Sequence, residues 1–212
     1  MSAYKNVYKI LAHPIRAMFR IRVHGAENIP ESGGYLICAN HTSLWDVFVI
    51  AVSLRRQVMY MAKKELFSIP LLGKIISALG AYPVNRGAAD ISAIKKTVSL
   101  LKDENIVGVF PQGTRHPGEN PRNTEVRHGV GLITYRAGCG VIPVYIKSKK
   151  NQVRPFRRAE LFIGEPIEFH NFGFHDGGMK EYTDAAEMIF DRICTIGENI
   201  PVENGGSENK KA

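Results

Sequence analysis

The chain has 212 residues, with 28 Lys and Arg against 20 Asp and Glu, which gives a formal net charge of +8. Its hydrophobic fraction of 44% and charged fraction of 23% lie near globular averages and exclude a disordered or low-complexity chain. The length fits one domain, and the basic charge favours an anionic partner: a nucleic acid, a phosphorylated metabolite, an acidic carrier protein or an anionic membrane.

The first predicted element is an amphipathic helix over residues 5–19, which Pro14 is expected to end or kink. Residues 1–22 contain five basic residues and no acid, but they lack the apolar core and cleavage site of a signal peptide. We therefore predict that residues 1–19 form a basic amphipathic segment that associates with a membrane.

Strand patterns and helical patterns alternate from there to the C-terminus. Alternating or short apolar runs predict strands at 19–24, 34–39, 57–62, 105–110, 141–146 and 161–169, and Pro166 places the last of them toward a sheet edge. A turn is expected at 25–34. Helical spacing predicts helices at 43–55, 71–80, 88–103 (buried face Ile91, Ile94, Val98, Leu101) and through Tyr182, Ala186, Ile189, Ile193 and Ile196.

This alternation predicts a single α/β domain over residues 20–198, with a mostly central β-sheet flanked by helices. Residues 199–212 are rich in Gly, Asn and Lys, and we predict a disordered tail there. No uninterrupted apolar run of about 20 residues exists, so no transmembrane helix is predicted.

Three cysteines, Cys38, Cys139 and Cys194, are far apart and form no CxxC pair. This argues against a disulfide framework and favours a reducing cytoplasm. Cys38 is best explained as a small buried strand residue rather than a nucleophile. The histidines lack paired-ligand spacing, so no metal site is predicted.

The first segment with possible chemistry is 40–46 (NHTSLWD). His41 follows a predicted buried strand, and Asp46 lies in the next helix, so the two side chains can meet at the helix end. A carboxylate bound to one imidazole nitrogen leaves the other nitrogen as a general base. The alternative is an N-terminal capping cluster of Thr42, Ser43 and Asp46 in which His41 is incidental.

The second segment is 110–115 (FPQGTR), in which a turn after a strand presents Gln112, Gly113, Thr114 and Arg115. An Arg beside a glycine turn suits a phosphate, because the guanidinium binds it bidentately and glycine lets the backbone approach. An ordinary surface turn with a solvated Arg is the alternative.

Three further segments are weaker when taken singly. Residues 80–86 place Arg86 after an apolar run, and Lys64 precedes another apolar run; either cation can bind a phosphate or remain a solvated charge. Residues 141–144 (VIPV) read as a buried core strand.

In this order, these segments resemble the motifs of the glycerolipid acyltransferase family, the 1-acylglycerol-3-phosphate acyltransferases in particular. Asn40, His41 and Asp46 match NHxxxxD, and residues 110–115 match FPEGTR at five of six positions. The runs 80–86 and 141–144 match the remaining two motifs. The similarity spans about residues 20 to 170 and implies a glycerol-3-phosphate acyltransferase-like fold.

The resemblance implies acyl transfer from acyl-CoA or acyl-carrier protein to the sn-2 hydroxyl of a lysophospholipid, with no metal or other cofactor. His41, oriented by Asp46, would take the hydroxyl proton, and transfer would be direct. The headgroup would meet Lys64, Arg86, Gln112, Gly113, Thr114 and Arg115. A helix over 66–79 would line the acyl pocket with Leu66, Phe67, Leu71, Leu72, Ile75, Ile76 and Leu79.

One position departs from the family pattern, since Gln112 stands where the family has Glu. The amide keeps an acceptor and gains donors but loses the charge, which removes any acid–base duty while leaving headgroup binding open. The change is compatible with a different substrate preference or with a less active homologue.

The substrate implies a membrane, and residues 147–158 contain six basic residues and no acid. Together with the basic N-terminal segment they predict peripheral, monotopic binding to the cytoplasmic face of an anionic membrane. Three alternatives remain: a nucleic-acid-binding module, which has only the basic charge in its favour, a membrane-bound homologue that has lost activity, and acylation of glycerol 3-phosphate or a lyso-aminolipid.

Overall fold

A seven-stranded sheet forms the centre of the protein, in the strand order β1-β7-β6-β2-β5-β3-β4. It is seen in a computed structural model that describes residues 2–84 and 91–201. All neighbouring strands are parallel except β6 and β7, which are antiparallel. The strands are β1 (Arg22–His24), β2 (Tyr35–Ala39), β3 (Val58–Lys63), β4 (Ala81–Val84), β5 (Ile106–Val109), β6 (Gly140–Ser148) and β7 (Ala159–Ile163).

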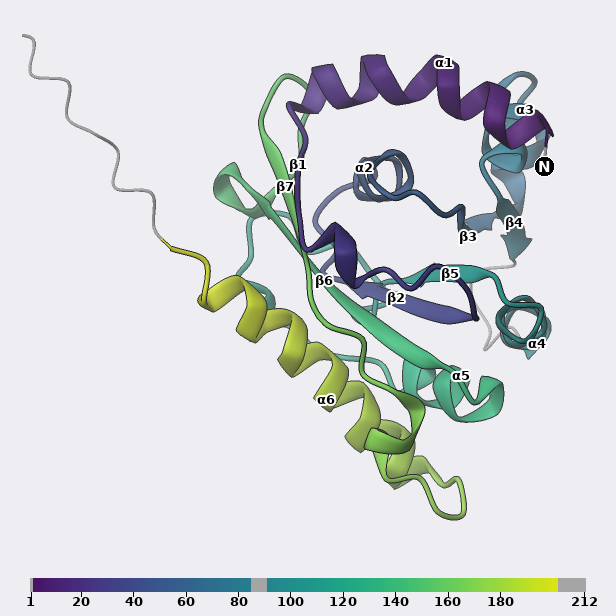
Figure 1. The fold of residues 1–212 in the computed structure, drawn as a ribbon, viewed down its shortest axis with the longest axis vertical. Helices are drawn as coiled ribbons and strands as arrows, with labels where there is room; N and C mark the ends of the chain where they lie inside the picture. The colour runs from purple at the N-terminus through teal and green to yellow at the C-terminus, as the bar shows by residue number, and fades with distance from the viewer. Residues whose placement is uncertain (1, 85–90, 202–212) are drawn as a thin grey trace, which may run out of the picture.

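Helices cover both faces of this sheet, so the α/β prediction is confirmed. One face carries the first two helices and the other carries the fourth to the sixth, with the sheet between them (Figure 1). The helices are α1 (Ser2–Phe19), α2 (Asp46–Ser53), α3 (Leu72–Ala78), α4 (Ile91–Lys102), α5 (Gly129–Ala137) and α6 (Met179–Glu198).

The central strand β2 shows why a continuous apolar sequence is needed at the middle of such a sheet. Leu36 and Cys38 point into the core beneath α4, α5 and α6, whereas Ile37 and Ala39 point into the core beneath α1 and α2. Because successive side chains of a strand alternate between faces, a strand covered on both sides must be apolar at every position.

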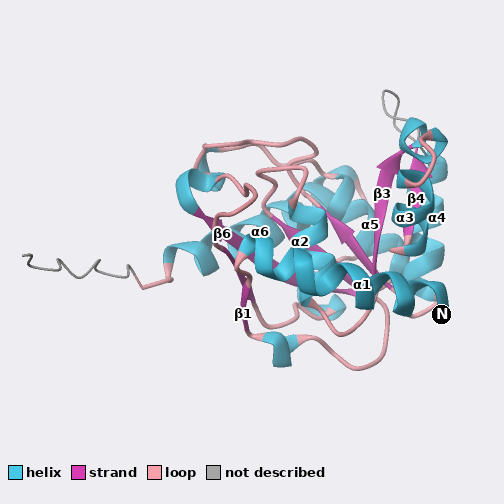
Figure 2. Cartoon of the chain, turned by 90° about the horizontal axis from the view of Figure 1, so that it is seen from above, coloured by secondary structure: helices cyan, strands magenta, loops and turns pink. Residues whose placement is uncertain are grey.

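Helix α1 continues through Pro14 instead of ending there, which corrects one expectation. Proline removes a single backbone hydrogen bond, and contacts with α2 hold the helix on both sides of that position. The Tyr8 hydroxyl and the Arg16 guanidinium both donate to the carbonyl of Val52, over 3.1 and 2.8 Å. The helix lies across the α2 side of the sheet (Figure 2).

The two strands nearest one edge are shorter than predicted. The segment 19–24 becomes a strand only from Arg22, because Phe19 closes α1 as a fully buried residue and Arg20 turns the chain with a φ of 44°. The segment 161–169 ends as a strand at Ile163, before Pro166, and β1 covers its outer side, so β7 is not the edge strand.

Several helices also differ from the predicted ones. The helix expected at 43–55 begins only at Asp46, and the apolar segment 66–79 is divided into a 3-10 turn (Lys64–Ser68) and α3, with Leu71 in a left-handed conformation between them. Helix α5 was not predicted, because two glycines in its first turn, Gly129 and Gly131, obscure the helical pattern.

The amphipathic helix at 88–103 is confirmed as α4, but its buried face is offset from the predicted one. Leu101 is buried as predicted and Ile94 and Val98 are partly buried, but Ala93, Thr97 and Leu100 are buried as well and Ile91 is 61% exposed. The C-terminal helix is confirmed and ends at Glu198; the expected tail falls largely on residues 202–212, outside the described residues.

Candidate active site

The carboxyl ends of β2 to β6 meet at one edge of the sheet, because these five strands run in the same direction. Polar sites in α/β sheets form at this edge. Strand β2 leads into Asn40 and His41, and its neighbour β5 leads into residues 110–115. The two sequence segments with the most specific motifs are therefore adjacent in space.

Asn40 fixes the start of this site. Its side chain is buried, donates to the carbonyl of Ile146 over 3.1 Å and accepts from the N–H of the same residue over 2.7 Å. The amide thus continues the pairing of β2 with β6 for one more residue, so the backbone that carries His41 is held in place. The sequence did not assign this role to Asn40.

His41 and Asp46 form the pair that the sequence predicted. Imidazole Nδ1 lies 2.9 Å from Asp46 Oδ2, and Asp46 is fully buried. The same Oδ2 accepts from the backbone N–H groups of Thr42 (2.6 Å) and Ser43 (2.8 Å), and Oδ1 accepts from the Thr42 hydroxyl (3.1 Å). A carboxylate acceptor fixes the Nδ1–H tautomer and leaves Nε2 as the basic nitrogen.

The capping alternative differs from what the structure shows, because the cap residue of α2 is Trp45 and no side chain makes a capping hydrogen bond there. Asp46 begins α2 and binds the N–H groups of Thr42 and Ser43 in the preceding loop while it also binds His41. The carboxylate shapes the loop as well as orienting the imidazole. Its four hydrogen bonds explain how a charge can be buried there.

An aromatic stack supports the imidazole. The ring of His41 lies on that of Phe110, with centroids 3.8 Å apart and planes inclined by 12°. On the other side, Tyr60 from β3 stacks on Phe110 at 6.3 Å. Burial raises the pKa of the Tyr60 hydroxyl well above its ordinary value, and the nearby charge of Asp46 raises it further.

The Tyr60 hydroxyl is buried and has no hydrogen-bond partner among the described residues. Sequence reasoning missed this residue. The available signal was Gly108 inside an apolar strand, because such a glycine often marks a close approach; its Cβ position lies 2.1 Å from Tyr60 Cε1.

Gln112 is only 2% exposed, and both ends of its amide bind within the protein. Its oxygen accepts from the backbone N–H of His41 over 2.6 Å, and its nitrogen donates to the Thr124 hydroxyl over 2.8 Å. That hydroxyl in turn donates to the carbonyl of Pro121 over 2.7 Å. The side chain therefore ties the backbone of His41 to the segment that follows the 110–115 turn.

The remaining headgroup candidates lie at the same edge but differ in setting. Gly113, Thr114 and Arg115 are exposed, and the next residue, His116, donates its backbone N–H to the carbonyl of His41 over 2.9 Å. Lys64 is exposed and directly follows β3. Arg86 lies outside the described residues.

The predicted acyl-pocket residues do not share one environment. Ile76 and Leu79 are buried at 8% exposure each, and Leu66, Phe67, Leu72 and Ile75 are partly buried. Leu71 is 71% exposed and faces solvent. The break before α3 causes this difference, because it turns Leu71 away from the packed side of the segment.

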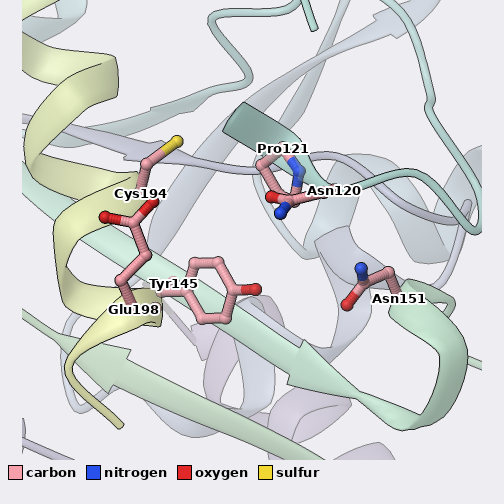
Figure 3. A pocket seen from close by; sticks show the side chains of 7 residues that line it. Asn120, Pro121, Tyr145, Asn151, Cys194 and Glu198 are labelled. Atoms are coloured by element: carbon pink, nitrogen blue, oxygen red, sulfur yellow. The ribbon is translucent and has the colours of Figure 1, made fainter. Parts of the chain in front are cut away.

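Two pockets lie elsewhere along this edge. One, of about 230 Å³, is enclosed by α6, the turn at Asn120 and Pro121, and Tyr145 and Asn151 (Figure 3). The other, of about 530 Å³, lies between the end of β6, the loop before β7 and Arg20. Neither includes His41 or Asp46.

The cysteines are all buried and free. Burial raises the pKa of the Cys38 thiol well above its ordinary value and that of the Cys139 thiol to about 12, which is unlike a reactive cysteine. Within the described residues, no cluster of side chains has the composition of a metal site, and no helix could cross a membrane.

Comparison with known proteins agrees with the motif resemblance. A family model described as acyltransferase matches residues 20–147. A 1-acyl-sn-glycerol-3-phosphate acyltransferase from Bacillus subtilis is 31% identical over 194 residues, which are 88% of this chain and 95% of that protein. The protein of the same name from Streptococcus pneumoniae is 28% identical over 177 residues, 80% of this chain and 64% of its own length.

A solved structure supports the fold. The crystal structure of the 1-acyl-sn-glycerophosphate acyltransferase PlsC from Thermotoga maritima matches with a TM-score of 0.66 at 24% identity, over 92% of this chain and 83% of that one. The acyltransferase-type α/β fold that the motifs implied is thereby confirmed.

Proposed function

The chain belongs to the acyltransferase family, and from this premise we propose that it acylates the sn-2 hydroxyl of 1-acylglycerol 3-phosphate. The acyl chain comes from a thioester, acyl-CoA or acyl-carrier protein, and the product is phosphatidic acid. The observation that carries the proposal is the His41–Asp46 pair in a family member whose relatives bear the name of this activity.

The chemistry begins at His41 Nε2. With Nδ1–H held by Asp46, Nε2 takes the proton of the sn-2 hydroxyl as its oxygen attacks the thioester carbonyl. The new C–O bond forms, the C–S bond breaks, and the imidazolium returns the proton to the leaving thiolate. The fixed carboxylate of Asp46 stabilises the imidazolium between these two steps.

Transfer is direct in this proposal, with no acyl-enzyme. Cys38 is the sole thiol near the motif in sequence, and its burial and raised pKa make it a poor nucleophile. Backbone N–H groups of the turn at Gly113 stabilise the tetrahedral oxyanion.

We assign the acceptor phosphate to Arg115, Lys64 and Arg86, with Gly113 and Thr114 beside them. Arg115 and Lys64 are exposed at the strand edge that carries His41. Gln112 has a different part, because both ends of its amide are engaged within the protein. It positions the backbone of His41 and does not contact the headgroup.

The acyl chain lies against the apolar segment 66–79, with the buried residues Ile76 and Leu79 at its base. The enzyme binds the cytoplasmic face of an anionic membrane peripherally, through basic residues of α1 and through Lys150 and Arg154, the two exposed cations of the segment 147–158 that do not line a pocket. Each such residue near the membrane surface contributes about 1 kcal/mol.

The test replaces His41 by Ala in the purified protein, with His128→Ala as the control because His128 is an exposed histidine at the start of α5. Loss of the general base is expected to lower kcat by about 10²- to 10⁴-fold, and His128→Ala should keep the wild-type rate. Thermal unfolding checks that both variants fold.

The assay offers lysophosphatidate and glycerol 3-phosphate in turn with each thioester donor, and mass spectrometry identifies the lipid product. A His41→Ala protein as active as wild type would contradict the mechanism. Exclusive acylation of glycerol 3-phosphate would contradict the assigned acceptor.

A further inference from the structure

A cationic pocket lies at the same sheet edge as His41. Strand β6 ends at this edge, whereas β7 and β1, which run the opposite way, begin at it. Basic residues lie at the end of β6, just before β7 and just before β1, and together they line a pocket of about 530 Å³. The lining residues are Arg20, Lys147, Ser148, Lys149, Phe156, Arg157, Arg158 and Glu160.

The charge of this pocket is strongly one-sided. It has five cations and one carboxylate, that of Glu160, which lies 3.3 Å from the imidazole Nε2 of His24. Within the described part of the chain, no side-chain hydrogen bond or ion pair engages Arg20, Lys149 or Arg157. Clustering unpaired cations in one concavity is unfavourable unless an anion neutralises them.

The pocket wall also holds a polar group without a partner. The Ser148 hydroxyl is buried, and none of the described residues accepts or donates a hydrogen bond to it. A buried hydroxyl left in this state costs about 1–3 kcal/mol. As a donor it suits a phosphate oxygen.

The backbone around the pocket is held in an unfavourable conformation. Six described non-glycine residues have a positive φ, and four of them lie in or beside the pocket: Arg20, Lys150, Asn151 and Phe156. Such conformations persist where the surroundings enforce them and concentrate at binding sites. Here the N–H of Phe156 donates to the carbonyl of Met18 over 2.9 Å, which joins the loop before β7 to the end of α1 (Figure 1).

Two contacts connect this pocket to the catalytic loop. The N–H of Val153 donates to the Thr42 hydroxyl over 3.3 Å, and that hydroxyl donates to Asp46. On the other side of the pocket, Phe19 contacts Trp45 with ring centroids 5.4 Å apart. Thr42 and Trp45, which precede Asp46 in the loop, therefore contact residues on both sides of the pocket.

The order of the strands places the pocket relative to His41. Along the edge, β6, β7 and β1 follow β2 on one side, whereas β5, β3 and β4 follow it on the other. At about 4.8 Å per strand, the pocket is centred roughly 10 Å to the side of His41. Lys64, assigned to the acceptor phosphate, follows β3 on the opposite side, and the turn that carries Arg115 passes over His41, since the next residue, His116, donates its N–H to the His41 carbonyl over 2.9 Å.

We propose that this cationic pocket binds the phosphate groups of the thioester donor. The inference rests on the proposed acyl transfer, in which two phosphate-bearing substrates must approach the imidazole from different directions. The donor phosphates sit at the far end of a pantetheine arm, so a phosphate site to the side of His41 lets the thioester carbonyl reach the acceptor hydroxyl that Nε2 deprotonates. The ring of Phe156, 77% exposed, lies among the cations and can stack on a nucleotide base.

The experiment removes two exposed cations of the pocket in the variant Lys149→Ala/Arg157→Ala. The control, Lys95→Ala/Arg136→Ala, removes the same two charges from exposed positions on α4 and α5, on the other face of the sheet. Calorimetry with coenzyme A and with adenosine 3′,5′-bisphosphate measures binding to the full-length protein without any turnover.

We expect the pocket variant to bind both probes at least ~10-fold more weakly, since charge-assisted contacts are about twice as strong as neutral ones, and the control to bind within about two-fold of wild type. In steady-state assays the KM for the donor should rise by a similar factor, with kcat and the KM for the acceptor unchanged. A pocket variant with wild-type affinity for coenzyme A would overturn the proposal.

A second arm separates the donor from a lipid headgroup as the source of phosphate. Sedimentation with phosphatidylcholine vesicles, with and without phosphatidylglycerol, is compared for both double variants. Loss of vesicle binding with an unchanged coenzyme A affinity assigns the pocket to lipid and contradicts the proposal. The wild-type protein can also bind coenzyme A more tightly than the pocket variant and yet not acylate lysophosphatidate. That result supports the assignment of the pocket to the donor and overturns only the proposed function.

Discussion

At the scale of single residues, Gln112 shows how one side chain can be both unusual for the family and well suited to its surroundings. Its carbonyl oxygen binds the His41 N–H, which any carboxylate could also do, but its amide nitrogen donates to Thr124. The Thr124 hydroxyl is committed as a donor to Pro121. The Thr124 oxygen can therefore accept a hydrogen bond from Gln112, whereas its only proton is not available to a carboxylate of Glu at position 112.

This pairing predicts the outcome of Gln112→Glu. The new carboxylate keeps the bond to His41, so we expect kcat for lysophosphatidate acylation to stay within about ten-fold of wild type. The free energy of unfolding should fall by about 1–3 kcal/mol, because a buried donor is replaced by a charge and the Thr124 bond to Pro121 is disturbed. Urea denaturation and initial rates measure the two quantities.

The control for this substitution is Gln112→Met, which has a similar volume but no hydrogen bond to either partner. It should lose more stability and more activity than Gln112→Glu, since the backbone of His41 then lacks its partner. An inactive wild type that gains activity through Gln112→Glu would instead identify a homologue that has lost its function.

The sequence predicted the contact between His41 and Asp46 correctly because it is local, five positions apart after the end of one strand. Gln112 was placed at the headgroup because a turn residue is normally exposed; its burial depends on Thr124, twelve positions away. Tyr60 was missed because its place beside Phe110 depends on β3 pairing with β5. Gly108 indicates a close approach, but no local pattern gives the order of strands and so the residue that makes it.

At the scale of elements, β5 carries a glycine because β3 presents a large ring to it. Tyr60 and Gly108 are paired across the two strands, and the Cβ position of Gly108 falls within the Tyr60 ring, 2.1 Å from Cε1. The ring can reach Phe110 and so support His41 only because this position lacks a side chain. The packing of Tyr60 against Gly108 therefore determines how Phe110, and through it the His41 imidazole, is supported.

Gly108→Ala tests this coupling. The added methyl group must displace Tyr60, so we expect the free energy of unfolding to fall by about 1–3 kcal/mol and kcat to fall together with it. Gly129→Ala is the matched control, because its Cβ position meets no atom within 4 Å and it lies at the start of α5. The control should be neutral or slightly stabilising, and an equal loss in both variants would contradict the coupling.

The sequence predicted strands well where burial on both faces requires an apolar run, as in β2 and β6. It predicted helices less well where tertiary contacts override a local sequence signal. Pro14 normally ends a helix, but the bonds from Tyr8 and Arg16 to α2 keep α1 intact. In α4 the buried face is chosen by Thr97, whose hydroxyl bonds to that of Tyr82 over 2.7 Å, and not by the most apolar stripe.

At the scale of the whole molecule, the topology distributes the excess positive charge around one edge of the sheet. The parallel strands bring Lys64 to one side of His41 and the Arg115 turn over it, and the reversed strands β7 and β1 bring the cationic pocket to the other side. The basic composition alone was compatible with nucleic acid, metabolite, carrier protein or membrane. Its arrangement at a sheet edge beside the His41–Asp46 pair favours phosphate-bearing substrates.

We place the proposed membrane contact on the outer surface of α1 and α3, which contact each other, and of the residues just before α3. Leu71 is exposed there at 71%, and so are two isoleucines, Ile10 at 70% and Ile69 at 47%. Transfer of an exposed aliphatic side chain out of water contributes up to about 1.5–3 kcal/mol, enough together with nearby basic residues for peripheral binding. Charged residues in place of the two isoleucines should therefore weaken that binding.

We expect Ile10→Asp/Ile69→Asp to lower the partition onto phosphatidylglycerol-containing vesicles by at least ~10-fold, since each 1.4 kcal/mol changes an equilibrium ten-fold. Ile91→Asp/Met179→Asp is the control, because both side chains are 61% exposed on helices of the other sheet face. Sedimentation measures the bound fraction at several salt concentrations. If both double variants lose binding equally, only net charge governs the attachment; if neither does, the membrane lies against a different face of the protein.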